Sequence, residues 1–121
     1  MAELHDLTAL EQGAAIAAGE VSSGELVEHY LARIAARDDV GAFVTVTSDQ
    51  ARARARQVTG VGPLAGVPTA IKDLNATAGV RTTFGSAAYD DFVPEVSDGV
   101  VLSMEAAGLV SLGKTATPEF G

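Results

Sequence analysis

With 121 residues, 47% of them hydrophobic, the chain can bury a core of its own and needs no disulfide or metal staple. Its 16 acidic residues against 8 basic ones give a formal charge of −8, which disfavours nucleic acid and anionic lipid as partners, and the absence of cysteine excludes a disulfide scaffold. The N-terminus carries acids where a signal peptide needs positive charge, and no apolar run approaches the roughly 20 residues that cross a bilayer, so we expect a soluble, cytoplasmic protein.

Capping patterns predict two helices near the N-terminus. Residues 8–11 form a capping box that opens an alanine-rich helix running to Gly19. Residues 22–25 form a second capping box, and the apolar side chains that follow it at helical spacing predict a helix through about Arg37.

A strand and a third helix follow in the sequence. Residues 42–47 (AFVTVT) are β-branched and aromatic, which favours a strand. Residues 48–60 are typical of a helix that ends near Gly60. The arginines of this helix, at positions 52, 54 and 56, resemble a basic patch, but residues two apart on a helix point to different sides. We therefore expect a solvated helix face.

Glycine and proline crowd the stretch from residue 60 to residue 68, which marks a connection with special backbone angles. We place the one internal boundary here. A helical segment with one strand would occupy residues 1–60, and a second segment would occupy residues 61–121.

The second segment predicts the order strand, long connection with a helix, strand, which is typical of an α/β fold. We expect N-terminal helices that lead into the first strands of a mixed sheet covered by helices. The expected elements are a strand at 67–72, a loop through Thr83, an acidic turn at 89–91, a helix capped by Ser97 or Asp98 and closed by Gly108, and a strand at 109–112.

The two lysines of the chain, Lys72 and Lys114, each end an apolar strand. A lysine in such a place either snorkels to the edge or is desolvated, so that a lowered pKa lets it act as a base. Alternation places Pro68 and Ala70 on the same strand face as Lys72, which leaves space for another segment to approach. The residues alone leave both roles open.

Three motifs resemble, in order, the opening of the amidase-signature family. The resemblance is strong from residue 60 onward, while residues 1–59 fit only in their helical character. It implies an amide-bond hydrolase that is built on a large mixed sheet, uses a Ser-cisSer-Lys triad and needs no cofactor. The motifs are LAGVPTAIKD at 64–73, GVRTTFGS at 79–86, and AGLVSLGKT at 107–115 followed by PEF at 118–120.

By this resemblance Lys72 is the catalytic lysine. In that scheme the neutral lysine takes a proton, relayed through the middle serine, from the nucleophilic serine, and backbone N–H groups hold the oxyanion. The two serines of the family lie in a Gly/Ser-rich stretch downstream of the GKT motif, and this chain ends at Gly121. We expect an incomplete N-terminal portion, inactive alone, that acts on a small-molecule amide together with the remainder of the amidase chain. The particular amide and a homo-oligomeric state stay open.

Other residues offer rival chemistries, each with a structural explanation. Ser86 is a possible nucleophile, but no G-x-S-x-G elbow surrounds it. Thr69 and Lys72 have the spacing of an S-x-x-K dyad, but in a strand residues three apart point to opposite faces. Residues 108–115 match the phosphate-loop pattern, but a helix precedes them and an apolar strand fills the interval. Lys114 and Thr115 are therefore interpreted as structural residues near the floor of the active site.

No metal site is indicated by the sequence. His5 and His29 each lack a second His or a Cys at metal-ligand spacing, so we expect them to be surface residues. Asp73 either hydrogen-bonds near the lysine that it follows or caps the end of the strand. The acids between residues 90 and 95 are expected to form a solvated loop.

A hypothesis from another class is a non-catalytic helical or α/β interaction module whose lysine is structural. Such a module would unfold in one cooperative transition as a monomer, whereas a fragment would aggregate, swap or stay loosely structured because its strand edges are unpaired.

Overall fold

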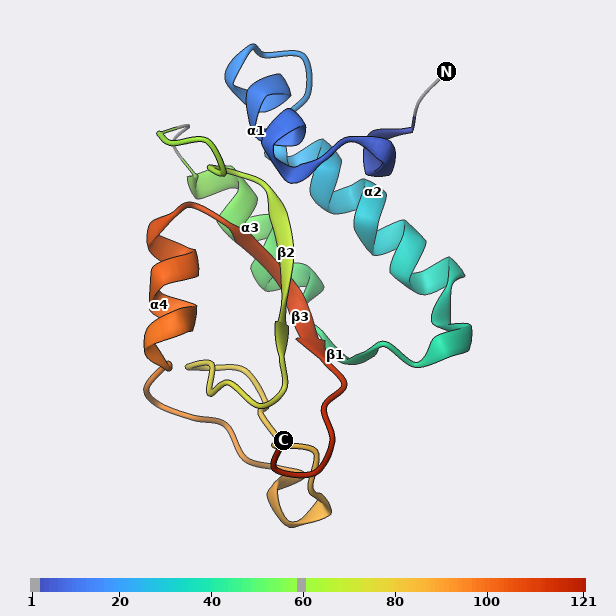
Figure 1. The fold of residues 1–121 in the computed structure, drawn as a ribbon, viewed down its shortest axis with the longest axis vertical. Helices are drawn as coiled ribbons and strands as arrows, with labels where there is room; N and C mark the ends of the chain where they lie inside the picture. The colour runs from blue at the N-terminus through green and yellow to red at the C-terminus, as the bar shows by residue number, and fades with distance from the viewer. Residues whose placement is uncertain (1–2, 59–60) are drawn as a thin grey trace.

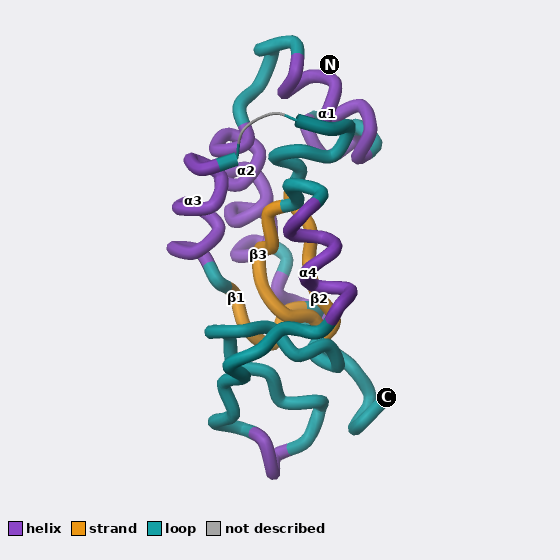
Figure 2. The backbone as a smooth tube through the Cα atoms, turned by 90° about the vertical axis from the view of Figure 1, so that its left-hand side faces the viewer, coloured by secondary structure: helices purple, strands orange, loops and turns teal. Residues whose placement is uncertain are grey.

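The computed structural model describes residues 3–58 and 61–121. Three strands lie between helices α2 and α3 on one side and helix α4 on the other (Figures 1 and 2). The elements in chain order are η1 (Leu4–Asp6), α1 (Ala9–Ala17), α2 (Ser23–Ala36), η2 (Asp38–Val40), β1 (Phe43–Val46), α3 (Ser48–Gln57), β2 (Pro68–Lys72), η3 (Ala87–Tyr89), α4 (Gly99–Ala106) and β3 (Val110–Thr115). In the part of the chain that is described, no helix combines the length and apolar character needed to cross a bilayer.

The strands form one mixed sheet in the order β1-β3-β2. Strand β1 pairs antiparallel with β3, and β2 pairs parallel with β3. The α/β class and the mixed sheet expected from the sequence are thus confirmed. The last strand runs to Thr115 and not to Leu112, because the polar residues that interrupt its apolar run still pair with both neighbouring strands.

The division of the chain at residues 60 and 61 stays a prediction. Gly60, where the third helix was expected to end, lies outside the described residues, and α3 ends at Gln57. Strand β1 comes from the first segment and pairs with β3 from the second, so the two segments share one sheet.

Helices α1 and α2 begin at the capping residues that the sequence indicated. The Thr8 hydroxyl accepts a hydrogen bond from the Glu11 N–H at 3.1 Å, and the Glu11 carboxylate accepts one from the Thr8 N–H at 2.8 Å. The pKa of Glu11 is lowered from its usual range. The largest cause is the hydrogen bond from the Thr8 backbone, and the Thr8 side chain adds to it. The Ser22 hydroxyl caps α2 by accepting from the Glu25 N–H at 3.0 Å.

Helix α4 starts where it was predicted, but its two candidate caps bond elsewhere. Asp98 is the N-cap residue, and within the described chain its side chain makes no capping hydrogen bond. Its carboxylate accepts from the Ala76 N–H at 2.9 Å, and the Ser97 hydroxyl accepts from the Ala78 N–H at 2.8 Å. Both side chains therefore hydrogen-bond to the loop that follows β2. The prediction that one of them caps α4 through its side chain is corrected.

The main buried cluster lies where α2 and α3 pack on β3. Its buried members are Val27, Leu31, Ala51, Val110 and Leu112.

The arginines of α3 contact different partners, as expected. Arg52 pairs with Glu28 of α2, whereas Arg54 donates to the Glu105 carbonyl of α4 at 2.7 Å.

Gly113 lets β1 approach β3 closely, and we predict that Gly113→Ala destabilises the fold. Its φ is 149°, and a Cβ there would lie 2.1 Å from the carbonyl oxygen of Thr45, so the two strands would have to separate. We expect the free energy of unfolding to fall by at least about 1–3 kcal/mol in a urea titration, the typical cost of overpacking.

The matched control for this prediction is Gly99→Ala at the start of α4. An added Cβ meets nothing within 4 Å among the described residues, so this variant should be neutral or slightly stabilising. Equal losses in both variants would contradict the close-approach explanation.

Candidate active site

A polar cluster, most of it buried, lies at the carboxyl ends of β2 and β3. We use this name for Asp73, Asn75, Thr82, Thr83 and Lys114. The loop after β2 folds back on the strand, so that the Phe84 N–H donates to the Asp73 carbonyl at 3.0 Å. This turn brings side chains from two parts of the loop against β3.

Lys114 is the central member of the polar cluster and is fully buried. Its Nζ donates to the Asn75 carbonyl at 2.7 Å and to the Thr82 hydroxyl at 2.9 Å, and it lies 3.4 Å from Oδ1 of Asp73. Burial lowers the pKa of the Lys114 ammonium, and the Asp73 carboxylate partly offsets this effect. An ammonium group has three donors: two of them make these hydrogen bonds, and the group also forms an ion pair with Asp73, which agrees with the structural role expected for this lysine.

Asp73 pairs with Lys114 and not with the lysine that it follows in the chain. The carboxyl group is 1% exposed, and its Oδ2 accepts from the backbone N–H and the hydroxyl of Thr83. Among the described residues, Oδ1 has no hydrogen-bond partner and faces only the Lys114 amine. The expected roles near Lys72 or as a simple strand cap are therefore corrected, because the loop closes over Asp73 and buries it.

Lys72 is the last residue of β2, and its side chain is exposed. Its carbonyl accepts from the Asn75 N–H at 3.0 Å, which fixes the backbone, whereas the described residues give its amine no hydrogen-bonding or ionic partner. The expectation of a desolvated amine is not met within this chain. Lys72 ends an edge strand of the described sheet and lies on the face opposite Ile71, which is buried.

A cavity of about 350 Å³ lies between the sheet, α3, α4 and the loop after β2. Thr69 and Ile71 of β2 line it together with Ser111 and Lys114 of β3, and in the described part of the chain Lys72 is not among its lining residues. Alternation along β2 thus places Thr69 and Lys72 on opposite faces, as predicted, and this geometry excludes an S-x-x-K dyad.

Two further sequence motifs have structural roles. The Ser86 hydroxyl is buried and accepts from the Ala88 N–H at 3.2 Å, which caps η3. The stretch that matches the phosphate-loop pattern follows a helix and contains strand β3, whereas a phosphate loop needs a preceding strand and a following helix. The geometry of this stretch is therefore not that of a nucleotide-binding loop.

The structure brings together two histidines that the sequence reasoning kept apart. Nδ1 of His5 lies 2.9 Å from Nε2 of His29, although 24 residues separate them in the chain. Both rings are half-buried and not simply on the surface. Local spacing carries no signal for such a pair, because the packing of η1 on α2 creates it.

The fold, with its strand that ends in a lysine, is the α/β fold expected from the amidase-signature motifs. The model of the amidase family matches residues 25–121. A glutamyl-tRNA(Gln) amidotransferase subunit of Thioalkalivibrio sulfidiphilus is 47% identical over 97% of this chain and 26% of its own length. The same subunit of Ralstonia nicotianae is 50% identical over 88% of this chain and 23% of its own.

Solved structures agree with these relatives. A bacterial aryl acylamidase of the amidase signature family superimposes with a TM-score of 0.87 at 31% identity, over 95% of this chain and 26% of its own. A 6-aminohexanoate cyclic dimer hydrolase also gives 0.87 at 31% identity, over 95% and 24% of the two chains. The chain belongs to the amidase family, also called the amidase-signature family. It spans about a quarter of the length of the relatives that it matches.

The match also reaches further toward the N-terminus than the motifs did. It begins at residue 25, and the relatives align over nearly the whole chain, whereas the sequence motifs were clear only from residue 60. The first helices carry capping patterns that are common to many helices, so a single sequence offers no motif there that is specific to the family.

Proposed function

We propose that this chain contributes the base of an amide hydrolase of the Ser-cisSer-Lys type, and that this base is Lys72. The observation that carries the proposal is the contrast between the two lysines. Lys114 is buried with two hydrogen bonds and an ion pair, whereas the Lys72 amine is exposed and, among the described residues, unpartnered. A structural lysine is held by partners, and a base must keep its nitrogen available for a proton.

The surroundings of Lys72 suit the approach of other groups. Pro68 and Ala70 share its strand face and are small, so a loop that bears two serines could reach the amine. Once covered, the site would disfavour the charged ammonium and favour the neutral amine that a base requires. The amine would then take the proton of the nucleophilic serine through the middle serine. We propose that polypeptide beyond Gly121 carries both serines.

Helix α4 supports the idea that further polypeptide packs on this chain. Val101 is fully buried, yet Val100 and Leu102 on either side of it are 50% and 53% exposed. A helix at a finished protein surface usually presents polar residues on its solvent side. An apolar outer face favours burial by another segment, such as the remainder of the amidase chain.

An amide-hydrolysis assay tests this division of labour. We expect no turnover of an acyl anilide by the 121-residue chain, and turnover by a longer chain that continues through the Gly/Ser-rich stretch. The matched control is the longer chain with both serines replaced by alanine. Turnover by the short chain would contradict the proposal, because that chain would then need a nucleophile of its own.

The carboxamide of glutamine is a second candidate substrate. Its support is the name that the similar relatives share, glutamyl-tRNA(Gln) amidotransferase, at 47% and 50% identity. The charge of −8 disfavours direct contact of this portion with tRNA, so the tRNA would be held elsewhere. Release of ammonia from glutamine by the longer chain would support this candidate, and hydrolysis of anilides without any glutaminase activity would count against it.

A further inference from the structure

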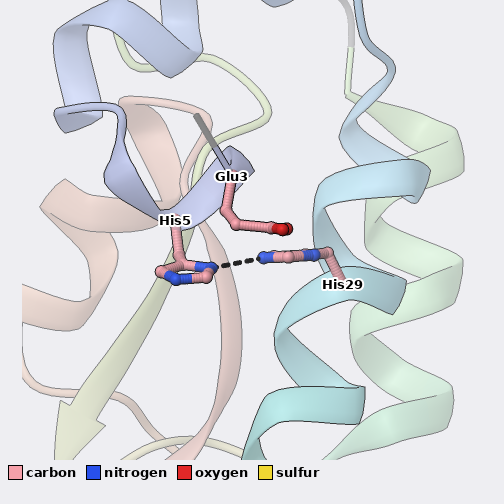
Figure 3. Close-up of side chains that lie close together, drawn as sticks. All are labelled: Glu3, His5 and His29. Atoms are coloured by element: carbon pink, nitrogen blue, oxygen red, sulfur yellow. Dashed lines mark hydrogen bonds between the residues drawn. The ribbon is translucent and has the colours of Figure 1, made fainter. Parts of the chain in front are cut away.

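Three metal-ligating side chains converge where η1 packs on α2. Figure 3 shows the carboxylate of Glu3 and the rings of His5 and His29 pointing toward one another. One potential ligand atom from each lies within 4.8 Å of the others. The two rings are nearly coplanar and meet edge to edge through their facing nitrogens (Figure 3), with centroids 5.2 Å apart and planes 16° apart. Within residues 3–58 and 61–121 this is the one such group of three or more.

We propose that Glu3, His5 and His29 bind a divalent transition-metal ion of the zinc class, with one coordination position left for water. Imidazole nitrogen and carboxylate oxygen are ligands that Zn²⁺ favours. In a tetrahedral shell with Zn–N distances of about 2.0–2.1 Å, neighbouring ligand atoms lie roughly 3.3 Å apart. The facing nitrogens of His5 and His29 are 2.9 Å apart and point at each other, so the rings would have to separate slightly and turn toward the ion to admit it.

Asp6 occupies the position of the carboxylate that commonly accepts a hydrogen bond from a metal-binding histidine. Its Oδ1 lies 3.8 Å from Nε2 of His5, the ring nitrogen that faces away from His29, and its Oδ2 accepts from the Glu3 N–H at 2.9 Å. A histidine ligand usually donates its second N–H to such a carboxylate, which fixes the ring and its tautomer. Asp6 would thus orient two of the three ligands.

The backbone of η1 is already held against α2 before any ion arrives. Gln12 of α1 is 3% exposed, and its side-chain amide donates to the Leu4 carbonyl at 3.2 Å and to the Tyr30 hydroxyl at 2.7 Å. The Tyr30 ring in turn packs edge-on against His29, with centroids 5.5 Å apart. These contacts pre-organise the ligands, which lowers the entropic cost of binding.

Without the metal, the facing nitrogens of His5 and His29 share one hydrogen. Binding requires a lone pair from each, so the ring whose facing nitrogen carries the hydrogen must adopt its other tautomer. For His5 that tautomer places the hydrogen on Nε2, toward Asp6. The ion would replace one hydrogen bond with a clamp between η1 and α2. Figure 1 shows this contact at the end of the molecule away from the carboxyl end of β2, so the site is separate from the proposed catalytic lysine.

Titration of the metal-free chain with Zn²⁺ tests the proposal. The chain has two histidines and no cysteine, so long-range ¹H–¹⁵N spectra of the imidazoles report on this site alone. We expect Nδ1 of His5 and Nε2 of His29 to shift as zinc binds, while Nε2 of His5 keeps its hydrogen. Ring nitrogens that stay unshifted at saturating zinc would overturn the site.

Calorimetric zinc affinities of variants give a second, independent test. We expect His5→Gln, His29→Gln and Glu3→Gln each to weaken binding by at least tenfold, and Asp6→Asn to weaken it by about 10- to 100-fold. Glu119→Gln, an exposed carboxylate variant near the other terminus, should leave the affinity unchanged. Circular dichroism checks that each variant keeps its helices. Unchanged zinc affinity in the double variant His5→Gln, His29→Gln would contradict the proposal. If that variant does not fold, the imidazole spectra of the unaltered chain test the proposal instead.

Discussion

Replacing Lys72 with alanine in the longer amidase chain is expected to lower kcat/KM for amide hydrolysis by about 10²–10⁴-fold, the usual contribution of a positioned general base. The nucleophilic serine would lose the acceptor for its proton, while the fold would be untouched because the exposed amine, among the described residues, has no partner to leave behind. Steady-state kinetics on one anilide substrate, together with a denaturation curve, separate a catalytic loss from a folding defect.

Lys72→Arg is the informative companion variant. It keeps a positive charge at the same position, but a guanidinium does not give up its proton in proteins, so a base would be lost all the same. Arg37→Ala, which removes an exposed cation at the end of α2, serves as the control and should retain activity within a few-fold. Near wild-type rates in Lys72→Ala would remove this lysine from the mechanism, and full activity in Lys72→Arg would reduce it to an electrostatic role.

The second large effect is expected at the buried pair of Asp73 and Lys114. Asp73→Ala should lower the free energy of unfolding by about 3–5 kcal/mol, because it leaves an ammonium buried without a counter-charge. It also removes the acceptor for the N–H and the hydroxyl of Thr83. Urea denaturation at neutral pH measures the loss. A change below about 1 kcal/mol would show that the pair contributes little.

This deficit should depend on pH with a defined sign. Burial lowers the pKa of Lys114 in the folded chain, and loss of Asp73 removes the group that offsets the shift. Between this lowered pKa and the ordinary value of about 10.4, the unfolded chain binds more protons than the folded one, so stability rises with pH. The destabilisation of Asp73→Ala should therefore shrink as the pH is raised toward about 10. A deficit that grows over this range would contradict the assignment.

A double-mutant cycle supplies the control for this pair. Lys114→Met alone leaves the Asp73 carboxylate buried without its counter-charge, and the double variant Asp73→Ala, Lys114→Met leaves neither charge. We expect the double variant to be less destabilised than the sum of the single variants, because no uncompensated charge remains. Strict additivity would mean that the two groups do not interact.

Local patterns in the sequence carried much of the secondary structure. The capping box at Thr8 and the cap at Ser22 set the helix starts, since their hydrogen bonds span three residues and need no distant partner. The alternation of β2 separated Thr69 from Lys72 for the same local reason. Where a side chain had a choice between a local and a distant partner, the prediction failed: Asp98 and Ser97 bond to a loop about twenty residues earlier and not to their own helix.

By itself, then, the sequence determined the α/β class, the starts of the first helices, and the motifs that mark the amidase family, on which the proposal for Lys72 rests. Only the tertiary structure decided which groups meet: Asp73 with Lys114, and His5 with His29. The first pair depends on how the loop closes over β3, and the second on how η1 packs against α2. Backbone propensities act within a few residues, whereas burial and ion pairing depend on segments that folding brings together from 24 or more positions apart.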